Sequence, residues 1–431
     1  MNTVAEANGV LRRTKYLAGI RWQRLRSDEL IKSSLYIFVA SATTAGLGFV
    51  FWVVNSRLYT PAEIGTATSL LSATSLISYL SLFGMNSTVI RYLPSSADRS
   101  RDVNAGLAVS LGLGLVLAFG FVALLPTIAP ELAWLGRSPW LALAFCLLAA
   151  FTGANLFTDS VFIAIRSAKW NALIDGLVQG GSKLALTLAF AVLGSFGIVL
   201  ASGLAAIIAV VCSLVALGFL VRYRPSLRFD WRAVRTMAGF SAAAYAGSLF
   251  NLAPVLVLPL IVLNELGARD AGYFFIAFQI ANLLYAVAYA ICQSLFAEGS
   301  HDEAALRALA ARAAKILAVA IVPAALVIAV ASGPILSIFG AGYRAASGPT
   351  LALLALSSIT VASYCWVGTL LKCAGRLGTY IWMNAAYGLT IVGVSIWSAQ
   401  RGLVWVAAAW LCGNAVATAA GGSVLAVRRR R

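Results

Sequence analysis

The sequence predicts an all-α integral membrane protein with about twelve transmembrane helices in two six-helix lobes. Hydrophobic residues make up 61% of the 431 residues and charged residues only 11%, which excludes an ordinary soluble domain. Apolar runs of about 20 residues, enough to cross a hydrocarbon core of ~30 Å, recur along the whole chain. The pattern also repeats after 207 residues, because Ser34 falls on Ser241 and Gly65 falls on Gly272.

Residues 34–94 carry the pattern on which this prediction depends. Two apolar runs flank the polar hairpin NSRLYTPAEIG, and the second run contains five serines, Ser72 and Ser75 among them. A transmembrane helix so rich in hydroxyl groups is not expected to face lipid on all sides. It packs against other helices or lines a wet cavity.

Charge distribution sets the expected topology. We expect twelve spans at 34–55, 65–85, 104–126, 140–163, 170–193, 197–221, 237–263, 271–294, 313–338, 349–371, 377–398 and 402–427. Most of the 32 Lys and Arg residues lie in alternate connections, as the positive-inside rule requires of cytoplasmic segments. Both termini are therefore predicted to be cytoplasmic, and the net charge of +17 indicates membrane lipids rather than nucleic acid as the partner.

The repeat divides the chain into a basic tail, two lobes and a basic linker. The tail is 1–33, the lobes are 34–221 and 237–427, and the linker is 222–236; a short basic tail, 428–431, ends the chain. Because six spans is an even number, both lobes are expected to have the same orientation. They form a parallel repeat about an axis along the membrane normal. No signal peptide is indicated, because the first 33 residues are polar and basic.

The segment LYTPAEIGTATSLLSATSLISYLSLFGMNSTVIRYLP, with Gly65, Gly84 and Arg91, resembles the multidrug/oligosaccharidyl-lipid/polysaccharide exporter superfamily. Within that superfamily it is similar to the bacterial polysaccharide flippases. The basic linker and the repeated opening of the second half support the likeness, which covers 34–427. The resemblance implies two lobes around a central cavity that opens alternately to each face of the bacterial cytoplasmic membrane.

The resemblance also implies a function and partners. The expected cargo is a polyprenyl-pyrophosphate-linked oligosaccharide for capsule, O-antigen or exopolysaccharide synthesis. H⁺ or Na⁺ as coupling ion and a polymerase of the same pathway are further candidate partners. Two alternatives stay open: an ion-coupled multidrug exporter of the same superfamily, and a membrane polymerase or ligase. The minimal outer loops and the single histidine argue against an enzyme.

Lys183 is the expected substrate-binding residue. It lies at or just past the middle of its span, ~20 Å from Lys169 at ~1.5 Å per residue. Its neighbours Gln179 and Ser182 make the patch polar, and Ser72 and Ser75 complete the expected substrate-binding set. A cation in the membrane is costly, and an ammonium group offsets part of the desolvation cost of a passing diphosphate. Alternatively, Lys183 snorkels or pairs with a carboxylate of a neighbouring helix.

Two further charge pairs are candidates for transport roles. Asp159 and Asp175 lie at similar depth on two arms of a hairpin, which suits ion coupling; the simpler alternative is static pairing with Arg166 and Lys169 in the turn. Arg91 and Glu298 occupy equivalent positions in the repeat and form the expected inner gate, unless they are solvated loop charges. The six cysteines lack the spacing of metal ligands, so neither a metal site nor a cofactor is predicted.

Overall fold

A computed structural model describes residues 44, 46–96, 98–167, 169–226, 242–299 and 306–427. Every regular element in these residues is helical, and they contain no β-strand. This agrees with an all-α membrane protein, because only helices and closed barrels satisfy their backbone hydrogen bonds inside lipid.

The first half begins with a helix over 46–58. It continues with α2 (Pro61–Leu82), α3 (Met85–Tyr92), η1 (Leu93–Ser95), α4 (Arg99–Ile128), η2 (Pro130–Leu132), α5 (Trp134–Arg137), α6 (Pro139–Ala164), α7 (Lys169–Asn171), a π-helix (Ala172–Gln179), α8 (Gly180–Ala189), η4 (Ala191–Leu193) and α9 (Ser195–Val221). The second half contains α11 (Ala242–Leu266), α12 (Ala268–Gly299), α13 (Leu306–Val330), α14 (Ser332–Ser337), α15 (Ala341–Cys373), α16 (Leu377–Ser398), η5 (Ala399–Arg401) and α17 (Leu403–Val427).

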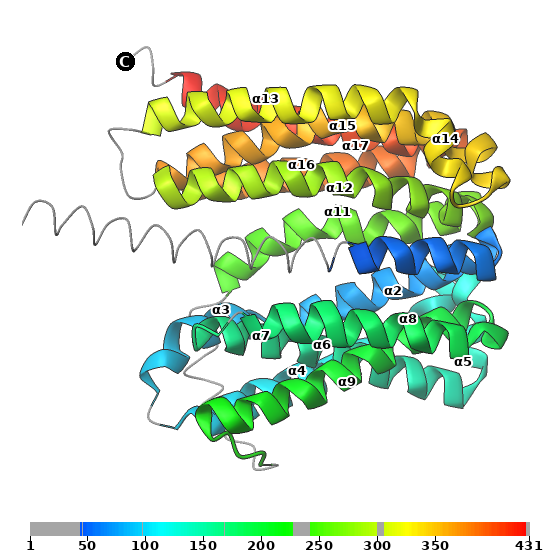
Figure 1. Cartoon of the computed structure of the whole chain (residues 1–431), viewed down its shortest axis with the longest axis vertical. Coiled ribbons are helices and arrows are strands. Elements are labelled where there is room, and N and C mark those ends of the chain that lie inside the picture. The colour runs from blue at the N-terminus through cyan, green and yellow to red at the C-terminus, as the bar shows by residue number, and fades with distance from the viewer. Residues whose placement is uncertain are drawn as a thin grey trace, which may run out of the picture.

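The helices form two packed groups that lie one above the other in Figure 1. Helices α2 to α9 pack among themselves in the lower group, and α11 to α17 pack among themselves in the upper group. Helix α2 is the main bridge between the groups, since it packs against both α11 and α12. We call the two groups the N-lobe and the C-lobe. The helix over 46–58 contacts both groups, through Phe51 on one side and Trp52 on the other, and is counted with the N-lobe because it precedes α2 in the first half of the chain.

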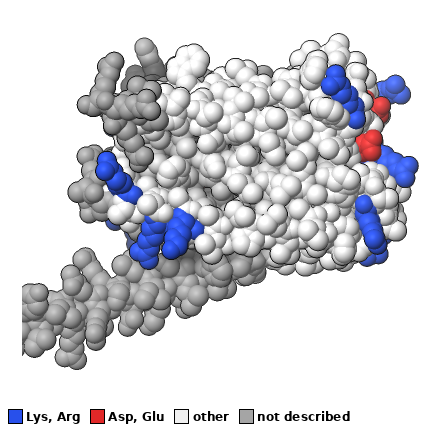
Figure 2. Space-filling view, turned by 90° about the horizontal axis from the view of Figure 1, so that it is seen from above, with Lys and Arg blue, Asp and Glu red and all other residues white. Residues whose placement is uncertain are grey.

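Within the described residues, seven helices are long and apolar enough to cross a membrane, or eight if the bent pair Pro61–Leu82 and Met85–Ser95 is one span. The twelve predicted spans all have helical counterparts, but the number twelve stays a prediction. Two predicted spans differ in detail: 313–338 is divided between α13 and α14, and 170–193 contains the π-helix. Figure 2 shows Lys, Arg, Asp and Glu only at the two ends of the face in view, with an uncharged band between them. The chain is a multi-pass membrane protein.

The turn before α2 is fixed by local capping. The Thr60 hydroxyl accepts from the Glu63 backbone N–H at 3.3 Å, while a Glu63 carboxylate oxygen accepts from the Thr60 N–H at 2.8 Å. Pro61 supplies the first helical residue, where a missing N–H costs nothing. The Tyr59 hydroxyl donates to the Thr187 carbonyl at 3.4 Å. Burial, and secondly the Glu63 carboxylate, raises the pKa of Tyr59, so this hydroxyl stays a donor at neutral pH.

The lobes touch backbone to backbone where α2 and α12 begin. A Cβ atom on Gly65 would lie 1.8 Å from the Ala268 carbonyl oxygen, and a Cβ on Gly272 would lie 2.0 Å from the Pro61 carbonyl oxygen. The two contacts are equivalent, because the 207-residue repeat relates Pro61 to Ala268 and Gly65 to Gly272. Only glycine permits this approach. We call this end of the molecule, where the two turns meet, the sealed end.

We expect Gly65→Ala to make the closed contact between α2 and α12 less stable by about 1–3 kcal/mol, the usual cost of forcing an extra methyl group into a packed contact. Hydrogen–deuterium exchange of the full chain in lipid nanodiscs should show faster exchange in 61–66 and 268–273. Gly112→Ala is the matched control, since a Cβ there meets nothing within 4 Å. Equal exchange in the two variants would contradict this account of the contact.

Candidate functional site: a polar cavity between the lobes

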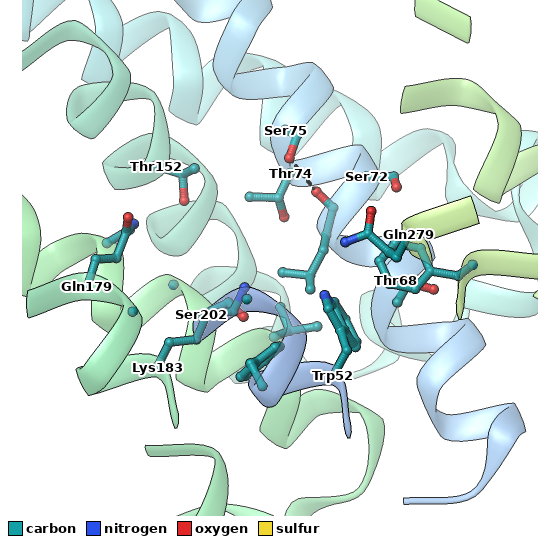
Figure 3. Close-up of a pocket in the computed structure, with 18 of the residues that line it drawn as sticks. Trp52, Thr68, Ser72, Thr74, Ser75, Thr152, Gln179, Lys183, Ser202 and Gln279 are labelled. Carbon is teal, nitrogen blue, oxygen red and sulfur yellow. Dashed lines mark hydrogen bonds between the residues drawn. The ribbon is translucent and has the colours of Figure 1, made fainter. Parts of the chain in front are cut away.

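A cavity of about 430 Å³ lies between the two lobes. The helix over 46–58, α2, the π-helix, α8 and α9 enclose it from the N-lobe, and α11 and α12 enclose it from the C-lobe. Figure 3 shows Gln179 and Lys183 on one side and Trp52 and Gln279 on the other. The cavity therefore occupies the position that the repeat predicts for a central pathway.

Helix α2 contributes a wall of hydroxyl groups. Thr68, Ser72, Thr74 and Ser75 all line the cavity. The Ser75 hydroxyl donates back to the Leu71 carbonyl at 2.9 Å, which leaves its oxygen able to accept. The remaining serines of the helix pack elsewhere: Ser69 donates to the Pro259 carbonyl, Ser78 donates to the Ala149 carbonyl, and Ser81 is buried. Both roles expected for this hydroxyl-rich helix occur, on different faces of it.

The opposite wall is formed by the π-helix and α8. Asp175, Gln179 and Lys183 all line the cavity, although eight residues of α-helix would turn the first about 80° away from the last. A π-helix closes its hydrogen bonds over five residues and so winds more widely, which brings the acidic group toward the side that carries the lysine. Gly176 permits close packing here, since a Cβ on it would lie 2.6 Å from the Thr44 hydroxyl oxygen.

The Lys183 ammonium group lies over aromatic rings. Its Nζ is 4.2 Å from the centroid of the Phe51 ring and 5.8 Å from that of Trp52, within the range of cation–π attraction. Across the described ranges, no carboxylate forms an ion pair with it; the one ion pair found there joins Arg101 and Asp102. The side chain lines the cavity and is neither snorkelling to an end nor paired with an acid.

Asp159 lies close to Asp175, and the two carboxyl groups interact electrostatically. Asn155 Nδ2 donates to Asp175 Oδ1 at 3.2 Å. Of the two acids, Asp175 lines the cavity and Asp159 does not. Neither forms an ion pair with Arg166 or Lys169 in the described part of the chain, so the static pairing considered from the sequence is not what the structure contains.

The C-lobe contributes polar groups that the sequence analysis missed. Gln279 and Asn282 of α12 line the cavity, and Asn282 Nδ2 donates to Gln279 Oε1 at 3.3 Å. A signal was present, because two amides three residues apart in an apolar span lie on one helical face. The rings of Trp52, Phe275 and Phe278 complete this side.

Besides Asp159, two of the predicted site residues, Ser182 and Arg91, lie outside the cavity lining. Ser182 is half-buried on α8 and is absent from the cavity lining. Arg91 is exposed on α3, with its guanidinium 5.6 Å from the centroid of the Tyr92 ring. The Glu298 side chain lies outside the described residues, so the proposed inner gate stays a prediction. Where the structure describes the chain, no group of three or more His, Cys, Asp or Glu residues is placed to hold a metal ion.

Comparison with known proteins places these features in context. The sequence profile of the family described as polysaccharide biosynthesis protein matches residues 54–347. The chain is 23% identical to the succinoglycan biosynthesis transport protein ExoT of Rhizobium meliloti (strain 1021), over 86% of this chain and 74% of that protein.

Solved structures share the fold. The lipid II flippase MurJ, in an inward closed conformation, superposes with a TM-score of 0.74 at 12% identity, covering 91% of this chain and 87% of that one. An inward-facing multidrug resistance MATE family transporter of the MOP superfamily superposes with a TM-score of 0.63 at 17% identity, covering 90% of this chain and 94% of that one. At these identities the likeness establishes the fold alone.

The ring over Lys183 should stabilise the protein through the charge that it contacts. We expect Phe51→Leu to lower the free energy of unfolding by about 2 kcal/mol more in the native chain than in a Lys183→Met background. A desolvated cation–π contact contributes about that much. Thermal unfolding of the four proteins of this double-mutant cycle measures the difference. Phe145→Leu, a buried ring of α6, is the control and should cost the same in both backgrounds. Equal losses for Phe51→Leu in both backgrounds would show that the ring acts by packing alone.

Proposed function

Because the chain belongs to the polysaccharide biosynthesis protein family, we propose that it moves a lipid-linked oligosaccharide across the bacterial cytoplasmic membrane by alternating access. The family match covers residues 54–347, which include all the lining residues from Thr68 to Asn282. The transport protein ExoT as a relative, and the shared fold of transporters, support transport over polymerisation or ligation.

One observation carries the proposal: a single lysine and a single acid face a cavity that is otherwise lined by hydroxyls, amides, aromatic rings and aliphatic side chains. A diphosphate entering a region of low dielectric needs a compensating cation, and Lys183 supplies one. Lysine is a compact charge on a flexible stem, which suits a ligand that must also leave. The rings of Phe51 and Trp52 stabilise the ammonium group while the cavity is empty.

The remaining lining suits sugars. Ser72, Ser75, Gln179, Gln279 and Asn282 present donors and acceptors without charge, the chemistry that matches sugar hydroxyls. A volume of about 430 Å³ lies toward the lower end of ligand pockets, ~300–1,000 Å³. We therefore propose that the cavity receives the diphosphate and the sugars nearest to it, rather than a whole oligosaccharide.

We propose the following topology. The N-lobe is 34–221, the C-lobe is 237–427, and the basic segments 1–33, 222–236 and 428–431 are cytoplasmic. The sealed end then faces outward and the cargo enters from the cytoplasmic side. Arg91 and Glu298 lie at the opposite end of their lobes, where they form an inner gate when the outer side opens.

Ion coupling is assigned to Asp159 and Asp175. Two neighbouring ionised carboxylates repel each other, so a proton or a cation shared by them stabilises the pair. Asp175 also lines the cavity, two helical turns from Lys183. Loading of the pair and binding of an anionic head group therefore act on neighbouring charges, which is the basis for coupling H⁺ or Na⁺ to transport.

A second candidate is export of organic cations. Asp175 and the rings of Trp52, Phe275 and Phe278 are the chemistry that would bind such ligands, and the MATE fold likeness favours the same class. Lys183 opposes it, because a fixed ammonium repels a cationic drug. The two candidates therefore make opposite predictions for the neutralised lysine.

Lys183→Gln should weaken binding of a short-chain polyprenyl diphosphate sugar by about 10- to 100-fold, the contribution of a charge-assisted hydrogen bond. Titration of the purified protein measures the binding, and complementation of a deletion strain measures polysaccharide export. Lys183→Arg should keep part of both activities. Lys169→Gln, an exposed position at the turn before the π-helix, is the control and should change neither. Normal export by Lys183→Gln would overturn the assignment, and improved binding of organic cations by that variant would favour the drug exporter.

Asp175→Asn should uncouple transport from its driving ion while sparing substrate binding. In proteoliposomes with an imposed pH or Na⁺ gradient, the gradient should no longer accelerate uptake of the labelled lipid-linked sugar. Asp159→Asn should have the same effect because the two acids form one pair, and Glu131→Gln, at an exposed position of η2, should have none. An unchanged gradient dependence in both Asp variants would remove the pair from the coupling mechanism.

A further inference from the structure

We infer that Arg57 and Asn264 form a paired outer clasp that holds the lobes together at the sealed end and must release on both sides for the cavity to open there. Arg57 is the last residue but one of the helix over 46–58, and Asn264 lies near the end of α11. Neither residue lines the cavity. The inference rests on the proposed alternating access and adds the residues that hold one of its two states.

The clasp consists of two hydrogen bonds that cross between the lobes in opposite directions. Arg57 Nη2 of the N-lobe donates to the carbonyl of Ile338 in the C-lobe at 2.5 Å. Asn264 Nδ2 of the C-lobe donates to the carbonyl of Ile128 in the N-lobe at 2.6 Å. In each case a side chain of one lobe reaches a main-chain oxygen of the other.

The internal repeat makes these two bonds equivalent. Arg57 and Asn264 are 207 residues apart, the same offset that relates Gly65 to Gly272. Both acceptors lie where a helix ends: Ile128 is the last residue of α4, and Ile338 directly follows α14. Carbonyl groups at helix ends lack intrahelical partners, so they are available as acceptors. One interaction is thus made twice, once from each lobe.

The glycine contact lies beside the clasp and shares its symmetry. Gly65 meets the Ala268 carbonyl, and Gly272 meets the Pro61 carbonyl. Main chains that meet at glycines do not interlock there, so the contacts at Gly65 and Gly272 separate without a change of rotamer at either residue. Arg57 and Asn264 are also exposed, which lets water replace their bonds when the lobes part. These are properties of a contact that opens and closes, and a permanent core contact would have buried partners.

Because a rocking motion separates both sides together, the two bonds are expected to act additively on one equilibrium. Losing one ordinary hydrogen bond shifts a two-state equilibrium by about fivefold, and losing both shifts it by about 25-fold. Arg57→Ala and Asn264→Ala should each raise the ratio of outward-open to closed protein by about fivefold, and the double variant should raise it by about 25-fold. Arg57→Lys keeps a charged donor and should lie nearer to the native chain.

Hydrogen–deuterium exchange of the full-length chain in nanodiscs tests the clasp without reference to any cargo. Exchange in 61–66 and 268–273 should rise by about these factors, while the helices inside each lobe stay unchanged. Two controls are matched for place and chemistry: Arg137→Ala, an exposed arginine on α5, and Gln400→Ala, whose bond to Glu265 at 2.9 Å stays within the C-lobe. Neither should raise exchange in these two segments.

The outcomes separate the clasp from the proposed function. Unchanged exchange in the double variant would overturn the clasp, and so would faster exchange throughout the lobe interiors, which would mean a structural role. The expected exchange combined with no transport of a lipid-linked sugar by the native chain would leave the clasp standing and reject the flippase. Transport assays on the double variant should then show altered turnover with unchanged binding of the diphosphate sugar.

Discussion

Lipid offers no hydrogen-bond partners, and most of this structure follows from that constraint. Backbone groups are satisfied inside helices, so the described chain is helical from 46–58 onward. A polar side chain in such a protein is satisfied in one of two ways: it hydrogen-bonds to a neighbouring backbone carbonyl, or it faces a water-filled interior. Helix α2 uses both, since Ser78 bonds to the Ala149 carbonyl while Ser72 lines the cavity. The same rule keeps Lys183 in the space between the lobes, with aromatic rings beneath its charge.

The internal repeat determines how the two lobes contact each other and how they can move. A repeat whose halves have the same orientation places equivalent turns at the same end, so Gly65 and Gly272 meet each other there. The glycine contact and the clasp are each made in two copies, and apolar side chains of both lobes also pack together in one core. Two lobes held in this way tend to move as rigid bodies, because their internal packing is far more extensive than the packing between them.

Much of the fold could be predicted from the sequence, because apolar length and loop charge depend on composition alone. The span over 65–85, the repeat and the polar patch at Lys183 were all readable in this way. The alignment of Asp175 with Lys183 was not, since α-helical geometry sets them about 80° apart and nothing in the composition signals a π-helix. Gln279 and Asn282 were missed for a different reason: neutral amides in an apolar run attract less notice than a charge, although they line the same cavity. Ser182 shows the converse, because closeness in sequence to Lys183 did not put it on the cavity wall.

The π-helix over Ala172–Gln179 has a consequence for how this protein tolerates insertions and deletions. Its wider winding absorbs residues that an α-helix of the same length along the axis would not hold. Deleting one residue between Asp175 and Lys183 would leave them seven residues apart, and seven residues of α-helix turn through about 700°, within about 20° of two full turns. Such a deletion would remove the π-helix and still leave both side chains on one wall. Winding all eight residues as an α-helix would instead turn Asp175 about 80° away from Lys183. The placement of acid and base on one wall therefore depends on the match between residue count and winding, and a change of winding that removes no functional group is enough to break it.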